Sequence, residues 1–181
     1  MTKILFLDRD GVINRFPGMG FYVTRQKDFH FLPNALRALG FLTRAGYELN
    51  VISNQGCVAR KLITRAGLDR LTQRMKRIVE KKGGRLRVFY CTHQQSDDCA
   101  CKKPKTKLFK KAIRGRKIDL RAAYFIGDSE EDVMAGKGLG CKTVLVLSGR
   151  NKRRDVGKFS VKPDFIKKDL WEAARWIIRK K

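Results

Sequence analysis

Short apolar runs alternate along the chain with longer segments whose apolar residues recur at helical spacing. The apolar runs occupy residues 4–8, 49–53, 86–91, 122–126 and 143–147. Their length and nearly continuous apolar character are typical of buried β-strands. A sixth, shorter strand is predicted at residues 165–166, where Phe165 and Ile166 stand between charged residues.

The segments between these runs have the pattern of amphipathic helices. Leu68, Leu71, Met75, Ile78 and Val79 fall on one helical face of residues 64–82, and a Gly-Gly pair ends that segment. Further helices are predicted at residues 33–45, 105–114, 130–137 and 170–180, and residues 151–158 are predicted to form a charged loop. Alternating strands and helices predict an α/β fold, a Rossmann-like three-layer αβα sandwich with a mainly parallel sheet.

The chain has 181 residues, which is enough for one full domain and its core. We therefore expect a single domain over residues 1–181. Polar residues cluster just after the predicted strands, and such sheets place their sites beyond the carboxyl ends of the strands. These residues are Asp8, Asp10, Ser53, Asn54, Lys103 and Asp128.

This combination suits phosphoryl transfer. Carboxylates from two strand ends can hold Mg²⁺, which prefers oxygen ligands. One aspartate can attack phosphorus, and a second, two residues on, can protonate the leaving oxygen. A hydroxyl, an amide and a lysine can bind the oxygens of the transferred group. Each short motif is common by itself, and the specificity lies in their order along successive strand ends.

Residues 91–104 contain a second candidate metal site. Cys91, His93, Cys99 and Cys101 supply three thiolates and one imidazole, a complete tetrahedral set for Zn²⁺. A site with four protein ligands has no open position, so we expect a structural zinc ion. A loop with chance cysteines and an iron–sulfur cluster are the alternatives, and the cluster usually requires four cysteines. Grouped cysteines also favour a reducing, cytoplasmic location over disulfides.

The charge of the chain is extreme for its length. It carries 42 basic and 17 acidic residues, a net charge of +25. A solvated basic surface is one interpretation, and a nucleic-acid partner is the other, because clustered cations attract phosphates. No apolar run approaches the ~20 residues of a membrane span, so we expect no membrane partner, and we expect a monomer.

The motifs FLDRDGVIN, ISNQ and GDSEED, with a lysine between the last two, resemble those of the haloacid-dehalogenase-like phosphohydrolases. The Cys-x-His and Cys-x-Cys-Lys-Lys-Pro segments resemble the histidinol-phosphate phosphatase-related branch. The resemblance implies that Asp8 is the nucleophile and a Mg²⁺ ligand. It also implies that Asp10 is the general acid/base, with its backbone carbonyl on the metal, and that Asp128 is the remaining ligand. Ser53 and Lys103 would hold the phosphoryl group, with Asn54 near the substrate.

The same resemblance implies a Mg²⁺-dependent phosphomonoesterase with a zinc-binding loop and no large cap domain. The expected substrate is a phosphorylated sugar, a heptose bisphosphate that loses its 7-phosphate. Lys102 stands where the branch usually has an arginine that recognises a second phosphate, so the substrate depends on this position. Histidinol phosphate, a nucleic-acid 3′-phosphate, and a zinc-bearing nucleic-acid-binding module without catalysis are the alternatives. Residues 14–21 and 91–107 are expected to form the walls of the site.

Overall fold

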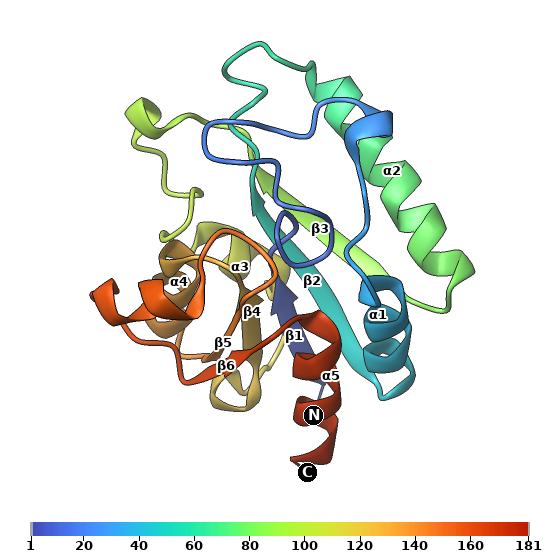
Figure 1. The fold of residues 1–181 in the computed structure, drawn as a ribbon, viewed down its shortest axis with the longest axis vertical. Coiled ribbons are helices and arrows are strands. Elements are labelled where there is room, and N and C mark those ends of the chain that lie inside the picture. The colour runs from blue at the N-terminus through green and yellow to red at the C-terminus, as the bar shows by residue number, and fades with distance from the viewer. Residues whose placement is uncertain (1, 181) are drawn as a thin grey trace.

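A computed structural model describes residues 2–180 of the chain. Six parallel strands form one sheet in the order β3-β2-β1-β4-β5-β6 (Figure 1). Every strand pair is parallel, so the prediction of a mainly parallel sheet is confirmed in a stricter form. The strands are β1 (Lys3–Leu7), β2 (Tyr47–Asn54), β3 (Leu86–Cys91), β4 (Tyr124–Gly127), β5 (Lys142–Val146) and β6 (Phe165–Lys167).

Helices cover both faces of this sheet, which gives the predicted three layers (Figure 1). α1, α2 and α5 pack on one face, and α3 and α4 pack on the other. The helices are α1 (Ala35–Arg44), α2 (Arg65–Lys81), α3 (Lys107–Ala112), α4 (Glu130–Leu139) and α5 (Leu170–Arg179).

The alternation of side chains along β1 explains the two apolar layers. Leu5 and Leu7 join the core under α1 and α5, whereas Ile4 and Phe6 join the core under α3 and α4. All four are at most 2% exposed, because successive residues of a strand point to opposite faces. A central strand with both faces covered must therefore be apolar throughout.

Polar side chains cap the N-termini of α2 and α5. The hydroxyl of Thr64 accepts a hydrogen bond from the Gly67 N–H at 3.0 Å, and Asp169 accepts one from the Glu172 N–H at 2.8 Å. The prediction of a loop at residues 151–158 was wrong in part, because Arg153–Lys158 form a short 3-10 helix. Its first turn is stabilised by Asp155, which accepts a hydrogen bond from the Lys152 N–H at 2.7 Å.

The chain leaves β1 in one direction to β2 and returns to its other side as β4. Loops that leave neighbouring strands in opposite directions open a crevice at the carboxyl end of the sheet. This switch point is where Asp8, directly after β1, and Asp128, directly after β4, come together. No helix within residues 2–180 combines the length and apolar composition needed to cross a membrane.

Candidate active site

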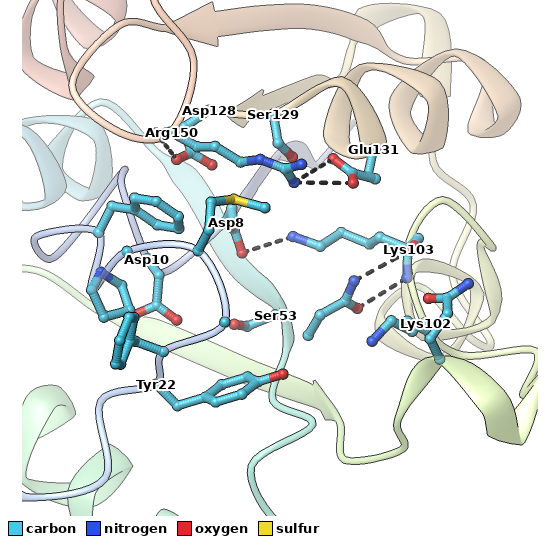
Figure 2. A pocket seen from close by; sticks show the side chains of 18 of the residues that line it. Asp8, Asp10, Tyr22, Ser53, Lys102, Lys103, Asp128, Ser129, Glu131 and Arg150 are labelled. Carbon is cyan, nitrogen blue, oxygen red and sulfur yellow. Dashed lines mark hydrogen bonds and ion pairs between the residues drawn. The ribbon is translucent and has the colours of Figure 1, made fainter.

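A cavity of about 490 Å³ opens at the carboxyl ends of β1, β2 and β4 (Figure 2). Residues 16–22 form one wall and Lys102–Pro104 form another, as the sequence predicted. A third wall was not predicted: the Arg150 side chain lies across it and donates to both carboxylate oxygens of Glu131 at 3.0 Å. All seven residues predicted for catalysis, substrate binding or Mg²⁺ line the cavity: Asp8, Asp10, Ser53, Asn54, Lys102, Lys103 and Asp128.

Lys103 is the buried cation of the site. Its ammonium lies 2.7 Å from Asp8 Oδ1 and 2.7 Å from Asp132 Oδ1, and the residue is 5% exposed. Burial opposes the charge of Lys103, but the carboxylates of Asp132 and Asp8 together raise its pKa above the ordinary value. Burial raises the pKa of Asp8 to about 7, against the opposing attraction of Lys103. Burial therefore disfavours the ionised form of Asp8, and the positive charge of Lys103 favours it.

Asp132 is the second carboxylate that contacts Lys103. Its second oxygen accepts hydrogen bonds from Ser129 Oγ at 2.7 Å and from the Asp128 N–H at 3.1 Å. Asp132 is 2% exposed, and both of its oxygens are engaged. It therefore fixes the direction of the lysine and closes the turn after β4.

Two glycines make room for Asp128. A Cβ atom at Gly149 would lie 1.9 Å from Asp128 Oδ2, and one at Gly11, whose φ is +88°, would lie 2.0 Å from it. The same oxygen accepts a hydrogen bond from the Arg150 N–H at 2.6 Å. Burial raises the pKa of Asp128 well above its ordinary value. A side chain at either glycine would displace this carboxylate.

The Asp10 carboxylate is held by the buried guanidinium of Arg9. Arg9 is completely buried, and its guanidinium donates to Asp10 Oδ1 from Nη2 and Nε, at 2.9 Å and 3.2 Å, and to Oδ2 at 2.8 Å. Asn14 donates to Oδ1 and Gln55 to Oδ2, each at 2.8 Å. Sequence reasoning missed these three partners. The available signal was an arginine directly after a buried strand, where a charge requires a partner.

Asn54 and Lys103 join two segments of the site through their backbone and amide groups. The Lys103 N–H donates to Asn54 Oδ1 at 2.9 Å, and Asn54 Nδ2 donates to the Lys103 carbonyl at 3.2 Å. Asn54 therefore fastens the end of β2 to the loop that carries the lysine. Ser53 lies beside it and accepts a hydrogen bond from Gln55 at 2.8 Å.

The carboxylate donor set fits a hard divalent cation. Asp8, Asp128 and Asp132 offer oxygens that lie within 4.8 Å of one another. Because Lys103 and Ser129 occupy the oxygens of Asp132, Asp8 and Asp128 are better able to bind the ion. Oxygen ligands of this kind suit Mg²⁺.

The predicted zinc ligands also come together. The Cys101 sulfur lies 3.1 Å from that of Cys91, 3.4 Å from that of Cys99 and 3.2 Å from His93 Nδ1. Ligands bound tetrahedrally with Zn–S bonds of about 2.3 Å would be about 3.7 Å apart. The four side chains therefore surround a space that a zinc ion fits after a small expansion. Cys57 and Cys141, outside the cluster, are buried, as expected for small apolar residues.

Comparison with known proteins identifies the family. A family described as "HAD-hyrolase-like" matches residues 100–173. The D-glycero-beta-D-manno-heptose-1,7-bisphosphate 7-phosphatase of Pseudomonas putida is 32% identical over 97% of this chain and 99% of its own length. The same enzyme of Helicobacter pylori is 36% identical over 81% of this chain and 84% of its own length.

A solved structure agrees with these relatives. The D,D-heptose 1.7-bisphosphate phosphatase from B. bronchiseptica, complexed with magnesium and phosphate, is 31% identical. It superposes with a TM-score of 0.91 and covers 99% of each chain. Identity above 30% along nearly the whole chain, together with this fold, places the protein in the haloacid-dehalogenase-like phosphatases, hydrolases of phosphoric monoesters, within the heptose-bisphosphate phosphatase family.

Proposed function

We propose that the protein removes the 7-phosphate of D-glycero-D-manno-heptose 1,7-bisphosphate, with Asp8 as the nucleophile. The observation that carries the proposal is the buried Asp8–Lys103–Asp132 set at the floor of an open cavity. It offers a reactive carboxylate beside a fixed cation. The names of the relatives support the substrate.

The chemistry proceeds in two steps. In the first, an Asp8 oxygen attacks phosphorus while the bond from phosphorus to the sugar oxygen breaks. Asp10 gives its proton to that oxygen, and an aspartyl-phosphate remains on Asp8. In the second, Asp10 takes a proton from a water molecule as the water attacks phosphorus. Inorganic phosphate leaves, and the Asp8 carboxylate and the Asp10 proton are restored.

Neighbouring groups make the attack feasible. Lys103 and Ser53 bind the oxygens of the transferred group and stabilise the negative charge that develops there. Asp8, Asp128 and the Asp10 carbonyl would hold Mg²⁺, which when bound would let an anionic carboxylate approach an anionic phosphate. Asn54 keeps Lys103 in place through its two hydrogen bonds to that residue's backbone.

The zinc loop positions the substrate side of the cavity. The four ligands Cys91, His93, Cys99 and Cys101 hold the segment just before Lys102 and Lys103. We assign Lys102, which lines the cavity, to the second phosphate of the substrate. Lysine offers a point charge where an arginine would offer a bidentate fork. With four protein ligands and no open position, a zinc ion held by this loop would be structural and would take no part in the chemistry.

The proposal is tested by phosphate release. The wild type, with Mg²⁺, is expected to hydrolyse an aryl phosphate, and Asp8→Asn is expected to abolish this activity while circular dichroism shows that the variant is still folded. No release by the wild type would refute the enzyme mechanism. A panel of heptose bisphosphate, histidinol phosphate and a 3′-phosphorylated oligonucleotide then tests the substrate. A higher kcat/KM for either of the last two would refute the sugar assignment.

A further inference from the structure

The positive charge is concentrated in two segments of the chain. Residues 60–87 contain eleven basic and two acidic residues, and residues 102–121 contain ten basic and one acidic residue. Together they carry +18 of the net charge of +25. Few of these cations line the catalytic cavity, so binding a sugar bisphosphate does not account for them.

The two segments meet at one edge of the sheet. β3 is the edge strand, with α2 against one face of the sheet and α3 against the other (Figure 1). A groove of about 250 Å³ lies between the two helices along β3. Arg65, Lys76 and Lys111 line it, together with the rings of Phe89 and Tyr90. Asp69, which pairs with Arg65 at 3.2 Å, also lines it. It shares no described lining residue with the catalytic cavity.

A separate row of cations lies on the solvent side of α2, roughly a third of a turn around the helix from the residues that line the groove. Arg70, Arg74, Arg77 and Lys81 are all exposed and recur at intervals of three or four residues, so they share one helical face. The row is about 16 Å long at 1.5 Å per residue. A linear array of this length spans several successive phosphates, which distinguishes a polymer from a small anion.

The surroundings also distinguish a polymer from a lipid surface. A membrane-binding surface presents exposed apolar side chains beside its cations. The large exposed hydrophobic residues of the described chain are Met19, Phe21, Leu62 and Met134, and all lie outside α2, β3 and α3. A concave groove with half-buried aromatic rings suits a strand with unpaired bases, because rings in such grooves stack on bases.

We propose that the β3 edge binds single-stranded nucleic acid. Arg65, Lys76 and Lys111 contact its phosphates in the groove, and the row on α2 adds longer-range attraction for the rest of the strand. Phe89 and Tyr90 contact the bases. Binding occurs away from the catalytic cavity and does not require hydrolysis, so it stands or falls independently of the proposed phosphatase reaction.

Fluorescence anisotropy with a labelled 20-nucleotide single strand measures this binding. The triple variant Arg65→Gln/Lys76→Gln/Lys111→Gln is expected to bind at least tenfold more weakly at 100 mM salt. The slope of log affinity against log salt is negative, and its magnitude is expected to decrease by about 2 in this variant, because each lost phosphate contact contributes about 0.7. The single change Lys111→Gln is expected to give about one third of that decrease in slope, which keeps the test valid if the triple variant is unstable.

A matched control carries the same loss of charge elsewhere. Arg154, Lys158 and Lys168 are exposed residues near β6, at the opposite edge of the sheet. Their replacement by glutamine is expected to weaken binding less than threefold. Equal losses in the two triple variants would overturn the proposal. So would the absence of binding by the wild type, tighter binding to a 20-base-pair duplex, or tighter binding to phosphatidylserine vesicles.

Discussion

Replacing Arg9 by methionine tests how the protein holds its second aspartate. The change removes a fully buried guanidinium and leaves the Asp10 carboxylate, whose side chain is 17% exposed, with Asn14 and Gln55 as donors. Removing one partner of a buried ion pair lowers the free energy of unfolding by about 3–5 kcal/mol. Two donors and some solvent remain for Asp10, and Arg9 Nη1 has no hydrogen-bond partner, so its removal returns about 1 kcal/mol. We expect a net loss of about 2 kcal/mol in the free energy of unfolding.

Urea denaturation at pH 7 measures this loss. Arg25→Met is the matched control, because Arg25 makes a comparable contact of 2.7 Å with Asp28 on the surface. An exposed pair contributes at most about 1 kcal/mol. In the double variant Arg9→Met/Asp10→Asn the unpaired charge is gone, and we expect about half of the lost stability to return.

Activity provides the second measurement of the same variant. If Arg9 orients the general acid, Arg9→Met lowers kcat by at least tenfold and leaves KM within about threefold, because general acid–base catalysis contributes about 10²–10⁴-fold. The reasoning would be refuted if the free energy of unfolding of Arg9→Met were within 0.5 kcal/mol of the wild-type value, or if its kcat were unchanged.

Other regions of the structure give three further predictions. Arg116 lowers the pKa of Glu48 to about 2. The ionised Glu48 therefore stabilises the folded protein fully above pH about 4.5, and this stabilisation is lost as the pH falls towards 2. Glu48→Gln is therefore expected to cost about 1–2 kcal/mol at pH 7, after allowance for partial exposure, and less at pH 3 in urea denaturation; an equal cost at both pH values would contradict the assignment. Gly149→Ala pushes a Cβ into Asp128, and a Mg²⁺ titration of activity is expected to show at least a tenfold higher half-saturation; an unchanged value would be evidence against Asp128 as a ligand. Elemental analysis of dialysed protein is expected to find about one equivalent of zinc, lost in Cys101→Ser; its absence from the wild type would disprove the structural site.

Local pattern determined the architecture of this protein. Apolar runs too short for helices, such as residues 86–91, could be buried only as strands, and the predicted range of this strand is the observed one. Alternation with amphipathic helices then required parallel pairing and placed Asp8 and Asp128 at one edge of the sheet. The cluster of three cysteines and one histidine was also predictable, because all four residues lie within eleven positions.

Tertiary structure alone decided which groups surround those residues. Asp128 is packed against Gly11, far away in the sequence, and accepts a hydrogen bond from the backbone of Arg150. Nothing in the local pattern reports such distant contacts. The position of the charge was hidden for the same reason: two basic segments separated along the chain meet only because β3 is the edge strand between α2 and α3. Periodicity records whether a residue is buried, and folding decides what it is buried against.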